Sequence, residues 1–86
     1  ESRNAQIAEQ SEADQGLIAA LKALRMRLAK EKRVPPYVIF SDKSLIDMAQ
    51  LRPRDDSEFG MVHGVGAAKL KEFGKVFLAA IREHRA

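Results

Sequence analysis

The sequence predicts an all-α fold, a compact bundle of five helices, and three observations support this. Leucines recur at alternating steps of four and three residues between Leu17 and Leu28, which is the spacing of one helix face. Beyond residue 40, capping residues precede apolar runs with helical periodicity, which indicates further helix starts. The one run with the composition of a β-strand, residues 34–40, has no second candidate strand to pair with. Eighty-six residues suit a single small domain.

The chain divides into a tail and a domain. Residues 1–13 are small and polar, and Ile7 is their only large apolar residue. Such a segment buries too little apolar surface to fold by itself, so we expect a flexible tail or interdomain linker. The regular apolar pattern begins at Asp14, and residues 14–86 form the predicted domain.

The first helix is predicted from Asp14 to about Lys32. Asp14 has a side chain suited to capping a helix start, and the leucine stripe follows it. Pro35 and Pro36 end the helix, because neither supplies an amide hydrogen and each restricts the residue before it.

The next segment, residues 34–40, is predicted to be an extended apolar connector laid across the helices. Ser41 then has the character of an N-cap, and Phe40 is placed to pack against Leu45 as a hydrophobic staple. The second helix is expected to end near Leu51.

Three shorter helices complete the predicted bundle. Asp55 and Glu58 have capping-box spacing, so a short third helix begins there and stops at the turn of residues 63–66. Gly74 marks a break or cap between the fourth helix and a last helix that ends near His84. We expect all four phenylalanines of the chain in the core, namely Phe40, Phe59, Phe73 and Phe77.

The positive charge is concentrated in one segment. Residues 15–40 carry six basic side chains against Glu31 alone, while residues 41–86 are nearly balanced. A polyanion is the natural partner of such a segment, and the alternative is a solvated helix face. The candidate nucleic-acid contacts in it are Lys22, Arg25, Lys32 and Arg33.

Gly64-Val65-Gly66 has the form of a helix-hairpin-helix turn. Two glycines allow an unusual backbone there and expose amide groups at the start of the next helix, where a phosphate can bind beside Lys69. Gly64, Gly66 and Lys69 are therefore candidate nucleic-acid contacts, and the alternative is a tight helix connection without a ligand. The residues after the turn fit neither a mononucleotide loop nor a dinucleotide fingerprint.

Tyr37 is the only tyrosine, and the chain has no tryptophan. It follows two prolines close to the basic end of the first helix. An exposed ring there would stack on an unpaired base while nearby cations hold phosphates. The alternative, left open by the sequence, is a core tyrosine with a satisfied hydroxyl group.

The sequence offers no catalytic constellation, so we expect no enzymatic activity, cofactor or metal in this domain. There is no cysteine, and two histidines without ligand spacing are too few for a metal site. The longest apolar run is too short to span a bilayer, and the first residues carry no signal-peptide pattern. We therefore expect a cytoplasmic protein.

Several motifs together resemble one family, the helicase and ribonuclease D C-terminal (HRDC) domain, in the form found in bacterial RecQ helicases. The resemblance covers about residues 15–85. The motifs that carry it are Leu24-Arg25, Val34-Pro35-Pro36-Tyr37-Val38-Ile39-Phe40-Ser41-Asp42, Leu45-Ile46-Asp47-Met48-Ala49, His63-Gly64-Val65-Gly66, Lys69-Leu70 and Phe73-Gly74-Lys75.

The resemblance implies a helical bundle that follows a linker at the end of a helicase whose ATPase lies elsewhere. In bacterial members the tyrosine that matches Tyr37 belongs to a basic surface for single-stranded DNA, and Arg25 and Lys22 match basic positions. The first helix departs from a more uniformly basic one at Ala20 and Ala23, and also at Met26.

The resemblance implies that the partners are single-stranded or branched DNA and the helicase core of the same parent chain. It places the domain, as a monomer, near the nucleoid in DNA repair and recombination. Two alternatives remain open: the equivalent domain of a ribonuclease D-type RNA-processing enzyme, and a protein-docking module without nucleic-acid affinity.

Overall fold

The computed structural model describes residues 12–85, and it describes side chains for residues 14–84. Residues 1–11 of the predicted linker lie outside the described part. Five helices and no strand make up that part, which confirms the all-α prediction. In chain order the helices are α2 (Glu12–Lys32), α3 (Pro36–Ile39), α4 (Asp42–Leu51), α5 (Asp56–Phe59) and α6 (Ala67–Arg85).

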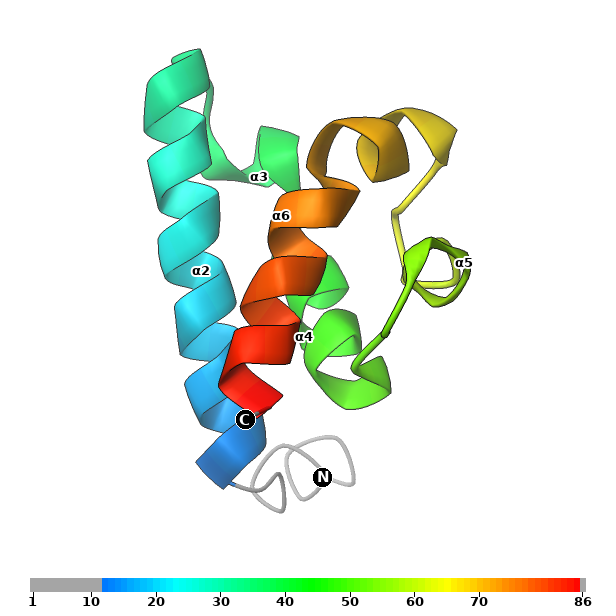
Figure 1. Cartoon of the computed structure of the whole chain (residues 1–86). Helices are drawn as coiled ribbons and strands as arrows, with labels where there is room; N and C mark the ends of the chain where they lie inside the picture. Colours follow the sequence, from blue (N-terminus) through cyan, green and yellow to red (C-terminus); the bar gives the residue numbers. More distant parts are fainter. Residues whose placement is uncertain (1–11, 86) are drawn as a thin grey trace, which may run out of the picture.

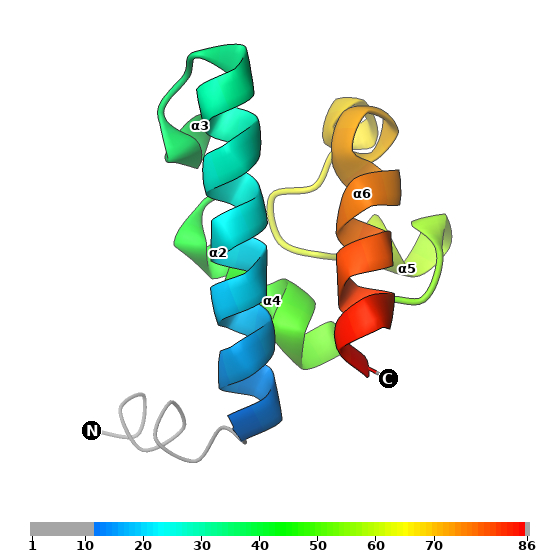
Figure 2. The same ribbon diagram turned by 60° about the vertical axis from the view of Figure 1, so that its left-hand side comes forward.

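The three short helices pack against two long ones, α2 and α6. Helix α3 lies beside the C-terminal half of α2, α4 packs along the N-terminal half of the same helix, between Arg25 and Asp14, and α5 packs on α6 (Figures 1 and 2). Leu17, Leu21 and Ala29 of α2 are buried, so the predicted leucine stripe faces the core.

Phe40 lies at the centre of the core. Its ring meets those of Phe59, Phe73 and Phe77 edge-to-face, with centroids 6.2, 5.8 and 5.0 Å apart. All four rings are buried, as predicted. This arrangement joins the residue that follows α3 to both α5 and α6, so the position of α3 depends on the core.

Two predicted caps are confirmed. The Ser41 hydroxyl accepts a hydrogen bond from the Ser44 amide at 3.2 Å, and the Asp55 carboxylate accepts one from the Glu58 amide at 2.9 Å. The Glu58 carboxylate accepts from the amide of Arg54 rather than from that of Asp55, so the capping box is displaced by one residue.

Two expected boundaries are wrong. Helix α2 already begins at Glu12, so Asp14 is not its N-cap; the Asp14 carboxylate accepts a hydrogen bond from Arg52 at 2.8 Å instead. Residues 34–40 are not extended throughout, because Pro36–Ile39 forms the helical turn α3. Proline is favourable at the first position of a helix, where the missing amide hydrogen has no partner to lose.

The expected break at Gly74 is also wrong, and α6 continues through it. Gly74 is buried, and a Cβ atom there would lie 2.9 Å from Leu70 Cδ1 and 3.8 Å from the Phe59 ring. The glycine therefore leaves room for the Leu70 side chain, one turn earlier in α6, while the Phe59 ring of α5 lies at ordinary contact distance. The predicted fourth and fifth helices are one helix, and α3 makes up the count of five.

Candidate nucleic-acid interface

Tyr37 is 73% exposed, which excludes the core alternative for this ring. It lies on α3, one turn long, directly after the basic C-terminal end of α2 (Figure 1). Val38 beside it is also exposed, whereas Ile39 and Phe40 are buried. Ile39 and the following Phe40 thus hold the turn in the core, while Tyr37 and Val38 face solvent.

Lys69 fixes this turn from the opposite side. Its ammonium donates hydrogen bonds to the carbonyl oxygens of Val38 and of Ile39, the latter at 2.8 Å. The same ammonium lies 5.6 Å from the centre of the Phe40 ring and 5.7 Å from that of Phe73. Lys69 was predicted as a phosphate contact, and its position instead ties the start of α6 to the α3 turn.

Arg25, another predicted contact, faces inward, and its side chain is 13% exposed. Nη1 donates to the Phe40 carbonyl oxygen at 2.9 Å and lies 2.8 Å from a carboxylate oxygen of Asp42. Its Nε is buried, without a hydrogen-bond partner in the described part of the chain. The guanidinium holds α2 against the α3–α4 junction, which leaves little of it for a phosphate.

The other predicted cations of α2 differ in their surroundings. Lys32 pairs with Glu72 at 2.7 Å and lies 5.6 Å from the Phe73 ring centre. Lys22 and Arg33 are exposed, and neither forms an ion pair within the described residues. Arg33 lies four residues before Tyr37 and ends α2 in a left-handed conformation, with φ of 59°. Arg33 is thus the predicted cation best placed, by sequence, beside the exposed ring.

The Gly64-Val65-Gly66 turn is fixed to α4. The Ser44 hydroxyl donates to the His63 carbonyl oxygen at 2.6 Å, and the His63 amide donates to the Asp47 carboxylate at 2.8 Å. Gly64 has φ of +79°, which glycine adopts without strain. Gly66 is exposed and immediately precedes α6. The two glycines of the turn are exposed, and the ammonium of Lys69 bonds the carbonyl oxygens of Val38 and Ile39.

A basic groove along α6 was not among the predicted site residues. It has a volume of about 560 Å³, and four cationic side chains line it together with one carboxylate, that of Asp56. Alanine and leucine side chains supply the rest of the lining. The cationic residues are Arg54, Lys71, Lys75 and Arg82. The recurrence of basic residues on α6 was a signal for it, but the near-balanced net charge of residues 41–86 concealed it.

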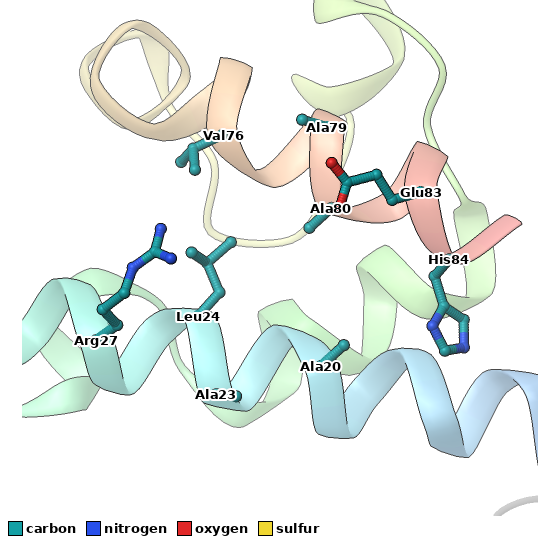
Figure 3. Close-up of a pocket in the computed structure, with 9 residues that line it drawn as sticks. All are labelled: Ala20, Ala23, Leu24, Arg27, Val76, Ala79, Ala80, Glu83 and His84. Carbon is teal, nitrogen blue, oxygen red and sulfur yellow. The ribbon is translucent and has the colours of Figure 1, made fainter. Parts of the chain in front are cut away.

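A second groove, of about 680 Å³, lies between α2 and α6. Ala20, Ala23 and Leu24 line it from α2, and Figure 3 shows Arg27 and Glu83 reaching towards it from the two facing helices. None of the predicted contact residues lines this groove.

The described helices include none that is long and apolar enough to cross a membrane. Among the described residues, no group of three or more His, Cys, Asp or Glu side chains is placed to hold a metal ion.

The comparisons with known proteins agree with this fold. The family model of the HRDC domain matches residues 14–81. The ATP-dependent DNA helicase RecQ of Haemophilus influenzae is 42% identical over 73 residues, which cover 85% of this chain and 12% of that protein. The ATP-dependent DNA helicase UvrD2 of Mycobacterium tuberculosis is 40% identical over 72 residues, covering 84% of this chain and 10% of that protein.

The fold also matches a solved structure, the third HRDC domain of Deinococcus radiodurans RecQ, with a TM-score of 0.79. The two sequences are 32% identical, and the match covers 85% of this chain and 95% of the solved one. The chain spans about a tenth of the length of the helicases that it matches. The family model, the helicase relatives and the superposed domain all identify the same module, and the chain belongs to the HRDC domain family.

Proposed function

We propose that this HRDC domain is an auxiliary single-stranded-DNA-binding domain of a DNA helicase and that Tyr37 stacks on an unpaired base. The observation that carries the proposal is the 73% exposure of Tyr37 on a turn whose backbone Lys69 holds in place. A turn whose backbone is already held in place loses little conformational entropy when a base stacks on the ring that it carries.

Exposed cations of α2 and its C-terminal end complete the proposed surface. Arg33 and Lys22 have no ion pair among the described residues and are proposed to contact phosphates, and Lys32 shares its charge with Glu72. Gly64 and Gly66 stay candidates for a backbone contact at the start of α6. The domain contributes binding and substrate selection, while ATP hydrolysis and unwinding reside in the parent chain.

The parent that we propose is a RecQ-type helicase that acts in DNA repair and recombination in the bacterial cytoplasm. Within it, this domain would be a monomeric module that also contacts the helicase core. The 42% identity to a RecQ protein and the superposition on a RecQ HRDC domain support it. The 40% identity to UvrD2 makes a second class of helicase the nearest competitor. The sequence upstream of this chain distinguishes these helicases, and it also distinguishes both from a ribonuclease D-type enzyme.

The test is a titration of the chain with a short fluorescent single-stranded oligonucleotide. If about three phosphates are neutralised, the logarithm of the affinity falls with the logarithm of the salt concentration at a slope of roughly −2. Tyr37→Ala is expected to weaken binding by about 1–3 kcal/mol, while Tyr37→Phe retains the ring and binds as the unaltered chain does.

Val38→Ala is the matched control, because it also removes an exposed side chain from α3 but no ring. Equal affinities for Tyr37→Ala and the unaltered chain would overturn the stacking proposal. No detectable binding at low salt would instead favour a protein-docking role.

A further inference from the structure

We propose that the basic groove along α6, formed by Arg54, Lys71, Lys75 and Arg82, is a second DNA-binding tract, separate from the Tyr37 surface, and that it holds the phosphodiester backbone without contacting bases. The proposal deepens the DNA-binding function proposed above. Two observations support it: the residues that line the groove, and the absence of ion-pair or hydrogen-bond partners for its cations among the described residues.

The cations of the groove are available for a ligand. In the described part of the chain, the basic groups of Arg25, Lys32 and Lys69 are occupied by carboxylates or carbonyl oxygens. The side-chain cations of the groove, by contrast, form no ion pair or hydrogen bond with described residues, and all four are exposed. Four exposed cations without a described partner therefore line this one groove, where their positive potentials add.

The spacing of these cations suits a linear polyanion. Lys71, Lys75 and Arg82 lie on one helix and line one groove, and a rise of about 1.5 Å per residue separates the first from the last by roughly 16 Å. A single phosphate would use only one end of such a row, whereas a chain of phosphates follows its whole length. Asp56 is the one carboxylate in the lining.

The remaining lining indicates which polyanion fits. Ala67, Leu70, Leu78 and Ala79 offer no aromatic ring for stacking and no side-chain hydrogen-bonding group. A base therefore gains little there, and an acidic peptide finds nothing besides the charges to fix its backbone. Binding of a phosphodiester chain through cations alone is sequence-independent and depends strongly on salt.

The experiment uses an oligonucleotide of abasic deoxyribose phosphates, which retains the charges and lacks the bases. We expect the chain to bind it, with NMR shift changes concentrated on the amides of residues 67–82. Because each phosphate contact on a single strand contributes about 0.7 to the salt slope, Lys71→Gln/Lys75→Gln should reduce the slope by about 1.4. Its affinity at low salt should fall roughly tenfold or more.

Three variants sharpen the comparison. Lys43→Gln removes one exposed positive charge from α4, outside the groove, and should weaken abasic binding less than Lys75→Gln does. Asp56→Asn removes the only carboxylate of the lining and should tighten binding. Val38→Ala removes an exposed apolar side chain outside the groove and should leave abasic binding unchanged.

The outcomes separate this proposal from the function proposed above. If Lys71→Gln/Lys75→Gln binds the abasic strand as the unaltered chain does, or if shift changes spread evenly over all exposed basic residues, the groove proposal is overturned. The Tyr37 proposal is then judged separately, on the ordinary oligonucleotide. If poly-glutamate occupies residues 67–82 more tightly than the abasic strand at equal charge, the groove is a peptide site and the proposal is wrong.

Discussion

Replacing Arg25 with alanine should destabilise the fold and leave DNA affinity nearly unchanged. A hydrogen bond from a charged donor, such as that from Arg25 to the Phe40 carbonyl oxygen, contributes about 1.5–3 kcal/mol. The ion pair with Asp42, whose side chain is 65% exposed, adds less than about 1 kcal/mol. The unpartnered Nε lowers the net contribution, so we expect a total loss of about 2–3 kcal/mol.

Such a loss is large for a chain of 86 residues, whose total free energy of unfolding is about 4–13 kcal/mol. It corresponds to a fall in Tm of roughly 10–20 °C. The assay pairs urea unfolding with DNA titration at a temperature where Arg25→Ala is folded. Asp42→Ala is the control and should cost less than about 1 kcal/mol, because it removes only the exposed partner.

The opposite pattern would refute this reasoning. If Arg25→Ala unfolds within about 0.5 kcal/mol of the unaltered chain but loses fivefold or more in DNA affinity, Arg25 is a phosphate contact, as the sequence suggested. Arg25→Lys separates charge from geometry: it retains the positive charge on a shorter side chain that does not reproduce the position of Nη1, the atom that reaches both oxygens, so it should also be destabilised.

Two further predictions concern backbone conformation, and both are measured by urea unfolding. Arg33→Gly should stabilise the domain by about 0.5–1 kcal/mol, because φ of 59° is strained for arginine. Arg52, with φ of 46°, is strained in the same way, but Arg52→Gly should not raise the free energy of unfolding, because it also removes the ion pair with α2. No gain for Arg33→Gly would contradict the strain. Gly64→Ala should cost about 1–3 kcal/mol, because φ is +79° and the new Cβ would lie 2.7 Å from Ser44 Oγ. Gly66→Ala meets no atom within 4 Å and should cost less than about 1 kcal/mol; equal losses at both glycines would contradict the reasoning.

Local signals in the sequence predicted much of the fold. The leucine stripe, the N-caps at Ser41 and Asp55 and the core phenylalanines act within a few residues or through general burial, so they can be recognised without a structure. The errors arose where tertiary contacts override local preference. Helix α6 continues through Gly74 because Phe73 and Phe77 on either side of it are buried in the core. Pro36 begins a turn because Ile39 and Phe40 can then be buried.

The candidate site was harder to predict, for a related reason. The partners that occupy the basic groups of Arg25, Lys32 and Lys69 lie many residues away along the chain, at Phe40, Glu72 and the end of α3. A charge count over residues 15–40 includes Arg25 and Lys32 as free cations, and Lys69 adds another in the count over residues 41–86. Tyr37 is different: the sequence left open whether its ring is exposed or buried, the structure shows it 73% exposed, and its contact with DNA stays a prediction.

Ion pairs between residues distant in the sequence explain why the cations of α2 and those of the groove along α6 differ in their availability to a ligand. Helices α2 and α6 carry five basic residues each, but the downstream carboxylates of Asp42 and Glu72 pair with Arg25 and Lys32 of α2. The cations that line the basic groove along α6, by contrast, have no partners among the described residues. The stacking of a base on Tyr37 is nearly independent of salt, whereas backbone binding in the groove weakens steeply with salt. Raising the salt concentration should therefore suppress the contribution of the groove first and leave the dependence of binding on Tyr37 more evident.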